Sequence, residues 1–588
     1  MEEKKLTGYP SIDKPWLKYY SEEAINAELP ECTIYQNIWQ HNKEYLDDIA
    51  LIYFGRKIPY RVLFEQVELC TTALELAGVG AGKRFALMLS CMPEASYLVL
   101  AASKIGAVVC FINPMVDRKQ KIAQLSYCDA KLLFVMDTML PYAADIMDTD
   151  GIEQVIIVPT INSMPQIISL IYKLKMWKKR KDFSVKKSDR FVSWNTFVQN
   201  KKSIADTPDD KMNLPFALVY SSGTTGIPKA IVLTNSGINA TIEQYIHANS
   251  EIKRGNRFLT ILPFYTSTGL IVCLLMPLCL GVTCILEPSY GSAPFYSTMT
   301  KQKVNYTFAP VSLWTSFIHK AEEKCLDLGY LQQPIIGGEV FPSELEAMFN
   351  SAFSKHNSKA KIQKGWGMCE LGATATITSD IHNIEGSVGI PLPRVTVAAF
   401  DPYTNNELPY EQRGELRVIT PSRMEGYQDN QKATEQFFYI DKNGKEWACT
   451  GDIGYIGKDG DVFVLGRMND SYITNDGETI YLFDIENLVA TDSAVELCEV
   501  VDMTVGGVPY PVVHIVLKDG EIFQWKTIIK RIHTACSKEL LPNAIPYCYN
   551  IRKEFPLKKG SAKRDTAALK QERDGFVDAD GNAVDFHA

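Results

Sequence analysis

The sequence lacks any clustering of residues that bind metals or form disulfides. Its 14 cysteines are scattered over 588 residues, with no Cys-x-x-Cys pair and no Cys/His group at the spacing of a zinc site. A chain of this length does not need disulfides to hold its fold. We therefore expect reduced thiols and a cytoplasmic protein.

The sequence also has no excess of basic residues, since its formal net charge is -8. Proteins that bind nucleic acid usually carry a basic surface, so we expect no nucleic-acid partner. Residues 1–5 are polar and no apolar run follows them, so we expect no secretory signal. The hydrophobic fraction of 46% is ample for a globular protein, and the length predicts at least two packed bodies.

Only two segments suggest contact with a membrane. Residues 269–286 are almost wholly apolar, but Pro277 and Gly281 interrupt them and no basic residues flank them, which favours a buried helix followed by a buried strand. In residues 167–177, apolar residues recur at helical spacing among lysines. This second pattern favours a solvated helix packed on the body, with peripheral attachment to an anionic membrane as the alternative.

Short apolar runs alternate with helical patterns through the first half of the chain. This alternation predicts βαβ units and largely parallel sheets. The expected strands are 85–90, 107–112, 132–136, 216–220, 257–261 and 282–286, and the expected helices are 95–105 and 119–127.

From about Gly414 the strands become shorter and the turns tighter. Asp459-Gly460 predicts a hairpin between two half-buried strands. We predict an α/β fold with a large multi-sheet domain, residues 1–468, and a small mobile α+β domain, residues 469–588.

The most informative segment is residues 220–229, Tyr-Ser-Ser-Gly-Thr-Thr-Gly-Ile-Pro-Lys, directly after an expected strand. Two glycines allow close backbone approach to an anion, the hydroxyls can donate to phosphate oxygens, and Lys229 adds a positive charge. The spacing is not that of a Walker A loop, because Lys229 follows Gly226 by three residues. We predict a phosphate-binding loop made of Ser221, Ser222, Gly223, Thr224, Thr225, Gly226 and Lys229.

This loop resembles that of the adenylate-forming superfamily, which includes acyl-CoA synthetases, luciferases and the adenylation domains of peptide synthetases. The resemblance extends from about Tyr60 to Leu569. It implies an enzyme that activates a carboxylic acid as acyl-AMP and transfers the acyl group to a thiol, with ATP, Mg²⁺ and coenzyme A as cofactors.

The resemblance also assigns residues to the nucleotide. Gly338 and Glu339 resemble the adenine-site loop, and residues 365–370 occupy the place of the Tyr-Gly-x-Thr-Glu motif. By this match Trp366 and Gly367 meet the adenine, and Glu370 binds Mg²⁺. Cys369 departs from the motif, because a thiol is a weak donor where the family has a threonine hydroxyl.

Further motifs lie towards the C-terminus. Thr450-Gly451-Asp452 resembles the ribose motif, and Arg467 matches the basic residue that reaches ribose or phosphate. Asn469 and Asp470 are alternative hinge pivots, and Gly477 resembles the glycine beside the coenzyme A channel.

The catalytic set implied by the resemblance is Lys563, Glu370 and Thr224. The expected Ser-Gly-Lys reads Gly-Ser-Ala-Lys here; register with Asp565 favours Lys563, and Lys559 is the alternative.

The implied acyl pocket or gate comprises Phe264, Tyr265 and Gly269, followed by a strongly apolar stretch. Apolar lining favours a medium- or long-chain fatty acid, with an aromatic acid as the alternative. Two other functions stay open: loading of an acyl carrier protein, and a ligand sensor without turnover. We expect a monomer or homodimer.

Overall fold

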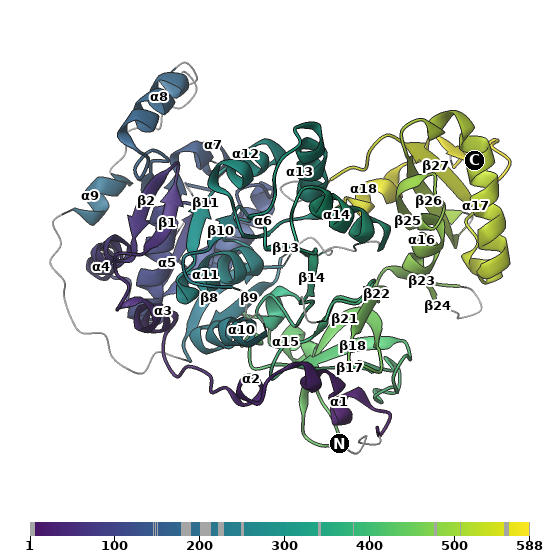
Figure 1. Cartoon of the computed structure of the whole chain (residues 1–588), viewed down its shortest axis with the longest axis horizontal. Coiled ribbons are helices and arrows are strands. Elements are labelled where there is room, and N and C mark those ends of the chain that lie inside the picture. The colour runs from purple at the N-terminus through teal and green to yellow at the C-terminus, as the bar shows by residue number, and fades with distance from the viewer. Residues whose placement is uncertain are drawn as a thin grey trace. The chain divides into compact units, whose positions relative to one another are not determined.

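The computed structural model describes residues 6–144, 146, 147, 149, 151–177, 190–199, 213–221, 228–248, 252–338, 341, 343–379, 382–474, 479–505, 507–557 and 564–586. These residues form two compact units. Unit 1 comprises residues 1–398, 417–449 and 456–463, and unit 2 comprises residues 399–416, 450–455 and 464–588. The elements are shown in Figure 1.

One sheet of unit 1 is built from the predicted βαβ units. Its order is β19-β9-β8-β4-β3-β5-β6-β7, and the six strands from β8 to β7 pair in parallel. The strands are β3 (Arg84–Met88), β4 (Val108–Phe111), β5 (Leu132–Met136), β6 (Gln154–Val158), β7 (Phe191–Ser193), β8 (Pro215–Tyr220), β9 (Ala230–Thr234) and β19 (Gly426–Tyr427). The connecting helices include α5 (Pro93–Ile105), α6 (Arg118–Cys128), α7 (Leu140–Ala143), α8 (Gln166–Trp177) and α9 (Trp194–Val198). The expected strands and helices of this region are confirmed, with ends shifted by one or two residues.

The second sheet of unit 1 has the order β16-β15-β14-β13-β12-β10-β11-β1-β2. Its strands are β1 (Ile49–Tyr53), β2 (Arg56–Pro59), β10 (Arg257–Thr260), β11 (Thr283–Leu286), β12 (Tyr306–Phe308), β13 (Gln333–Gly337), β14 (Gln363–Trp366), β15 (Thr376–Ile377) and β16 (Ile390–Pro391). The helices α12 (Ser292–Gln302), α13 (Val311–Glu323) and α14 (Ser343–Lys355) pack against it around the buried Trp314 and Phe317. Parallel pairing from β1 to β14 through β11, β10, β12 and β13 confirms the predicted sheet type.

The long apolar segment is buried, as the sequence predicts. It forms a π-helix, η4 (Thr268–Leu275), then α11 (Met276–Leu280) and strand β11. Leu270, Val272 and Leu275 have no exposed surface. Across the described residues, no helix is both long enough and apolar enough to span a membrane.

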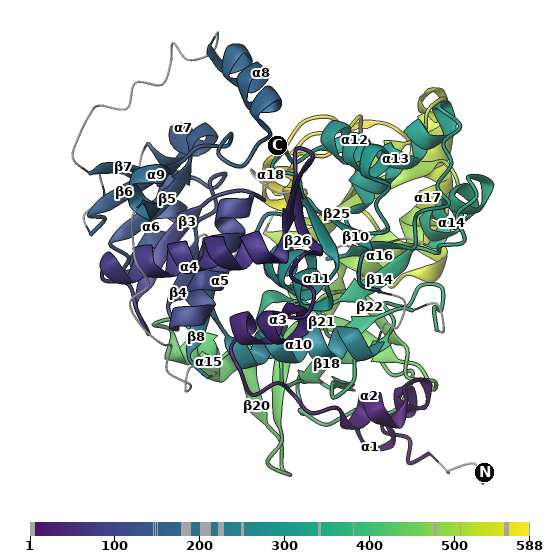
Figure 2. The same cartoon turned by 60° about the vertical axis from the view of Figure 1, so that its left-hand side comes forward.

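The remaining helices of unit 1 lie near its N-terminal segment and around these sheets (Figure 2). They are α1 (Pro10–Asp13), η1 (Pro15–Tyr19), α2 (Glu22–Asn26), α3 (Ile34–Asn42), α4 (Tyr60–Leu76), η2 (Asp137–Met139), α10 (Asn235–Ala248), η5 (Cys369–Leu371) and α15 (Gln431–Phe437). Helix α3 begins with a complete capping box, in which Thr33 accepts from Gln36 N–H and the Gln36 side chain accepts from Thr33 N–H.

A third sheet has five strands. It contains β17 (Thr396–Phe400), β18 (Gly414–Ile419), β20 (Phe438–Ile440), β21 (Glu446–Ile456) and β22 (Val462–Arg467). The predicted hairpin is confirmed: β21 pairs with β22, and Gly460 has a φ of +98° in the turn, where glycine is favoured.

Most of unit 2 is the α+β body that the sequence predicts after the hairpin. Its five-stranded sheet has the order β25 (Val495–Val505), β26 (Val508–Leu517), β27 (Cys548–Arg552), β28 (Phe576–Val577) and β29 (Ala583–Val584). Helices α16 (Leu482–Ala490) and α17 (Trp525–Glu539) pack on it, through a core that includes Ile485, Ile515 and Ile529. The other elements are β23 (Ser471–Ile473), β24 (Thr479–Tyr481), η6 (Glu521–Gln524), η7 (Pro542–Ala544) and α18 (Thr566–Gln571). The predicted boundary after residue 468 and the mobility of the small domain stay predictions.

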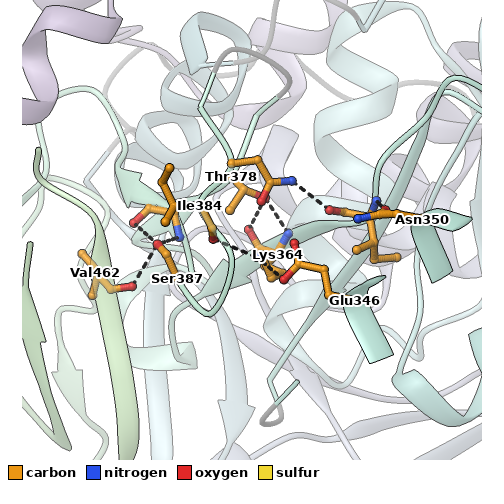
Figure 3. Close-up of polar contacts among 10 residues, drawn as sticks. Glu346, Asn350, Lys364, Thr378, Ile384, Ser387 and Val462 are labelled. Atoms are coloured by element: carbon orange, nitrogen blue, oxygen red, sulfur yellow. Dashed lines mark hydrogen bonds and ion pairs between the residues drawn. The ribbon is translucent and has the colours of Figure 1, made fainter. Parts of the chain in front are cut away.

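A buried ion pair fixes β14 to α14 in unit 1 (Figure 3). Lys364 Nζ donates to Glu346 Oε2 at 2.6 Å and to the Ile384 carbonyl at 3.0 Å. The backbone N–H of Lys364 also donates to the Thr378 hydroxyl at 2.8 Å. Burial lowers the pKa of Lys364, and the bond to Glu346 opposes this shift. The pair therefore fastens α14 to β14, while pairing with β13 and β15 gives β14 its place in the sheet.

We predict that Glu346→Gln lowers the free energy of unfolding by about 3–5 kcal/mol, because it leaves a buried ammonium without its counter-charge. Urea unfolding measured by tryptophan fluorescence checks this. The double variant Glu346→Leu/Lys364→Met should lose less than the single variant. Glu322→Gln is the matched control: its partner Lys355 also lies on α14, but that pair is exposed, so the expected change is below about 1 kcal/mol. Equal losses in the two single variants would contradict the prediction.

Candidate functional site

The two ends of the predicted phosphate loop are held together by hydrogen bonds. Strands β8 and β9 pair antiparallel up to Tyr220 and Ala230. Beyond that pair, Ser221 N–H donates to the Lys229 carbonyl at 3.0 Å, and Lys229 N–H donates to Ser221 Oγ at 3.1 Å. The loop residues Ser222, Gly223, Thr224, Thr225 and Gly226 lie outside the described residues. The structure thus fixes both ends of the loop, with Lys229 at one of them.

The end of β14 carries the predicted adenine motif. Trp366 is 8% exposed, and its carbonyl accepts from Ala375 N–H at 2.8 Å. Gly367 has no room for a side chain, since a Cβ there would lie 2.3 Å from the Ala373 carbonyl oxygen. On the neighbouring strand, a Cβ at Gly337 would lie 2.7 Å from the Gly365 carbonyl oxygen. These glycines allow close approach of backbone to backbone at the ends of β13 and β14.

Gly338, the first residue of the predicted adenine loop, follows β13 with a φ of +79°. Nothing lies within 4 Å of a Cβ built there. The glycine is therefore required by the backbone conformation and not by crowding. Glu339 lies outside the described residues.

One tyrosine connects two of the predicted site residues. The Tyr427 hydroxyl donates to Glu370 Oε1 at 2.9 Å, and Lys229 Nζ lies 4.7 Å from the centroid of the Tyr427 ring. Tyr427 is positioned by β19, which pairs with β9, and by a hydrogen bond from its N–H to Thr434 Oγ1. Burial and the Glu370 carboxylate raise the pKa of Tyr427 well above its ordinary value, so the hydroxyl stays a donor at neutral pH.

Glu370 is oriented by its backbone as well as by its carboxylate. Its carbonyl accepts from Met424 N–H at 2.8 Å, and its side chain is 6% exposed. No cluster of three or more metal-ligating side chains occurs among the described residues. A single buried carboxylate fits Mg²⁺, which proteins commonly hold through one or two carboxylates together with substrate phosphates and water.

Cys369, where the family motif has threonine, is next to a hydroxyl from another segment. Ser267 Oγ donates to Cys369 Sγ at 3.1 Å, and Ser267 is 2% exposed. A hydroxyl therefore lies within hydrogen-bond distance of the thiol, although a different residue supplies it.

The predicted acyl-pocket residues lie before and within η4. Phe264 is buried, and Gly269 permits close contact, because a Cβ there would lie 2.2 Å from the Pro263 carbonyl oxygen. Burial raises the pKa of Tyr265 to about 12, so this phenol is neutral where the family commonly has histidine. Complete burial of the apolar residues of η4 also results from core packing, so their role in an acyl pocket stays a prediction.

Within unit 2, the predicted ribose residues form a compact hydrogen-bonded group. Arg467 Nε lies 2.8 Å from Asp452 Oδ1, and Arg467 also donates to the Thr450 carbonyl at 3.1 Å. The Asp452 side chain is 7% exposed and that of Arg467 is 50% exposed. Gly466 leaves space for Phe483, whose Cδ1 atom lies 2.3 Å from the position of a Cβ. The structure thus brings together two residues that are fifteen positions apart.

Asn469 and Asp470, the alternative hinge pivots, are exposed and lie in the turn between β22 and β23. Asp470 N–H donates to the Arg467 carbonyl, and the Asp470 carbonyl accepts from Leu482 N–H. Gly477, Lys559 and Lys563 lie outside the described residues.

The sequence reasoning missed Tyr427 and Ser267. Gly426-Tyr427 is too short and too common a pair to indicate a site, and no spacing connects it to residue 370. Ser267 is two residues after the predicted gate residue Tyr265. This closeness in sequence to Tyr265 was the one available indication that Ser267 lies near the site.

The described residues include a lysine at the end of a loop rich in hydroxyls, and a buried carboxylate hydrogen-bonded to Tyr427. These groups are of the kinds that bind phosphate and a cation in α/β proteins. The chain belongs to the AMP-binding enzyme family, whose model matches residues 38–428. This finding confirms the resemblance found in the sequence.

Named relatives cover most of the chain at low identity. A long-chain-fatty-acid–CoA ligase of Bacillus subtilis is 25% identical over 560 residues, 92% of this chain and 95% of the relative. A 4-coumarate–CoA ligase of Petroselinum crispum is 27% identical over 457 residues, 75% and 76% of the two chains. The crystal structure of an anthranilate CoA ligase with anthranoyl-AMP has a TM-score of 0.77 at 19% identity and covers 92% of this chain and 97% of that one. This structural likeness confirms the fold.

We predict that Tyr427→Phe weakens binding of Mg²⁺-ATP about ten- to hundredfold, because a hydrogen bond to a charged acceptor contributes roughly 1.5–3 kcal/mol. Isothermal titration calorimetry measures the affinity. Tyr427→Leu, which also removes the ring beneath Lys229, should weaken binding further. The matched control is Tyr53→Phe, because the buried Tyr53 hydroxyl donates only to the Thr160 carbonyl among the bonds described. Wild-type affinity in Tyr427→Phe would contradict a role in orienting Glu370.

Proposed function

We propose that the protein activates a carboxylic acid with ATP, releasing pyrophosphate, and transfers the acyl group from the acyl-AMP to coenzyme A. The observation that carries this proposal is the contact of Tyr427 with both Glu370 and Lys229. It holds a carboxylate and an ammonium near the end of a loop rich in glycine and hydroxyls. The ATP-binding part is supported by membership of the AMP-binding family.

In the first step, a carboxylate oxygen of the acid attacks the α-phosphorus of ATP, and pyrophosphate leaves. Negative charge builds on the phosphate oxygens, and preorganised donors stabilise it. The proposal assigns this role to the loop hydroxyls with Thr224, to Lys229 and, by its motif, to Lys563. Mg²⁺ bound at Glu370 would supply further neutralisation of the phosphate charge.

In the second step, the thiol sulfur attacks the acyl carbon, AMP leaves, and the thiol loses its proton. Asp452 and Arg467 are proposed to hold the ribose, supported by their ion pair in unit 2. Gly477 is proposed to leave room for the thiol arm. The division into domains 1–468 and 469–588, with a pivot at Asn469 or Asp470, belongs to this proposal.

For the acid we propose a medium- or long-chain fatty acid. The apolar character of η4 beside Phe264 and Tyr265 supports an apolar acyl group, and each methylene buried contributes about 0.8 kcal/mol. The names of relatives include both a fatty-acid and a coumarate ligase, so the aromatic alternative enters the test. All 14 cysteines are free thiols, which supports a cytoplasmic enzyme.

We predict pyrophosphate release with acids of medium or long chain, and AMP release only when coenzyme A is added. The measurement is an assay of both products across acids from C2 to C18 and aromatic acids. Strongest turnover with an aromatic acid would overturn the substrate class. Transfer only to a carrier protein would overturn the acceptor, and nucleotide binding without any pyrophosphate release would overturn the enzyme.

We predict that Lys563→Ala slows acyl-AMP formation on the order of 10²- to 10³-fold or more, the effect of losing one preorganised donor to a developing charge. Lys559→Ala is the matched control, a basic residue four positions earlier. Pyrophosphate exchange measures the first step alone. The reverse order of effects would assign the catalytic role to Lys559 and would reject the register with Asp565.

A further inference from the structure

The thiol of Cys369 stands where the family motif has a threonine hydroxyl. A thiol is a weaker donor and a weaker acceptor of hydrogen bonds than a hydroxyl. Negative charge builds on the phosphate oxygens while acyl-AMP forms, so a weaker donor at this position should slow the first step. The structure nevertheless shows a hydroxyl beside this thiol, supplied by Ser267 of another segment.

Ser267 directs its hydroxyl away from its own segment. It is the residue before the π-helix η4, and its side chain makes no capping hydrogen bond to that helix. Its Oγ instead donates to Cys369 Sγ at 3.1 Å, across 102 positions of sequence. The neighbouring Thr266 supplies the local bond, since Gly269 N–H donates to Thr266 Oγ1 at 3.1 Å. The Ser267 hydroxyl therefore serves η5 and not the turn on which it lies.

The turn that carries Ser267 is tightly built. Thr266 donates twice to the Pro263 carbonyl, from its N–H at 3.1 Å and from its Oγ1 at 2.8 Å. Gly269 has no room for a Cβ beside the same carbonyl oxygen. Ser267 itself is 2% exposed. Its hydroxyl thus has a fixed position, which is what a group that orients another group requires.

The η5 turn is held by several separate segments. Glu370 accepts a hydrogen bond from a residue of β19, and Ser422 Oγ donates to the Leu371 carbonyl at 2.9 Å. At Cys369 the contact from outside the turn reaches the side chain, through Ser267. Removal of the Ser267 hydroxyl would therefore leave the backbone of η5 held and the thiol less restrained.

Of the two side chains, that of Cys369 is the more accessible. Cys369 is partly exposed, whereas Ser267 is almost fully buried. Burial, then Glu370, then the Cys369 side chain raise the pKa of Tyr427, so the thiol lies near the phenol that contacts Glu370. A phosphate bound together with Mg²⁺ at Glu370 would find the thiol more accessible than the Ser267 hydroxyl.

We propose that Ser267 is a positioning residue, whose hydroxyl orients the Cys369 thiol so that its S–H donates to an α-phosphate oxygen while acyl-AMP forms. This rests on the proposed function, because the place of Cys369 in the nucleotide site comes from its motif. The hydrogen bond that sulfur receives also polarises its S–H, since hydrogen bonds in a chain strengthen one another. Ser267 thereby compensates for the weaker donor.

The test is a double-variant cycle at residues 267 and 369, with acyl-AMP formation measured by pyrophosphate exchange. The acid is the one with the strongest turnover among acids from C2 to C18 and aromatic acids. Ser267→Ala should lower kcat of this step about three- to tenfold, the effect of one neutral hydrogen bond. Its affinity for ATP in calorimetry should stay within about twofold of wild type, because the bond acts on charge that develops later.

Cys369→Ser places a hydroxyl, a stronger donor than a thiol, at the same position without added bulk. In this background Ser267→Ala should lower kcat less than about twofold, because the donor no longer depends on Ser267. A merely structural role of Ser267 would give the same loss in both backgrounds. The dependence on residue 369 thus reports the interaction between the two side chains.

The matched control is Ser422→Ala. Ser422 is also buried, and its hydroxyl holds the same turn through the Leu371 carbonyl and not through the thiol. Its substitution should change kcat by the same factor in the wild-type and Cys369→Ser backgrounds. Thermal unfolding of every variant, followed by circular dichroism, separates lost activity from misfolding.

Three results would overturn the proposal: wild-type kcat in Ser267→Ala, an equal loss of kcat in both backgrounds, or a dependence of Ser422→Ala on residue 369 as strong as that of Ser267→Ala. The last would show a general effect on the turn. Absence of pyrophosphate exchange in the wild type would instead reject the proposed function on which this inference rests.

Discussion

The hydrogen bond from Tyr427 to Glu370 joins segments 57 residues apart and gives the candidate site its geometry. Glu370 follows β14, Lys229 precedes β9, and β19 pairs Tyr427 with β9. One side chain thereby relates a carboxylate suited to a cation and an ammonium suited to phosphate. Without it, the Glu370 carboxylate would lose the hydroxyl that orients it, at an energetic cost typical of a charged hydrogen bond.

The same principle recurs elsewhere in the molecule: charged groups are held by partners that limit their movement. Asp452 is held by Arg467 in unit 2, and Lys364 is held by Glu346 in unit 1. Such pairs contribute little net stability because desolvation opposes their attraction. Their effect is to fix positions, which a site for a highly charged substrate requires.

Much of the fold could be predicted because its causes are local. Alternating apolar runs and helical periods give the parallel sheets, and Asp459-Gly460 gives the turn between β21 and β22. The assignments of Trp366, Glu370, Asp452 and Arg467 to the nucleotide come from the resemblance of short strings to family motifs, and they stay predictions. Tyr427 could not be found this way, since its role arises from strand pairing across almost 200 residues and leaves no local pattern.

Helix α8 shows which of its properties the sequence predicts and which depend on the folded structure. Its sequence determined that residues 166–177 form an amphipathic helix with lysines nearby, because periodicity and charge are local properties. That Ile167, Leu170, Ile171 and Leu174 of this helix are exposed was decided by tertiary structure. The sequence likewise determined which residue types are present to bind a nucleotide. Only the folded chain decided which of them come within hydrogen-bond distance, because those distances depend on strands that are adjacent in space and remote along the chain.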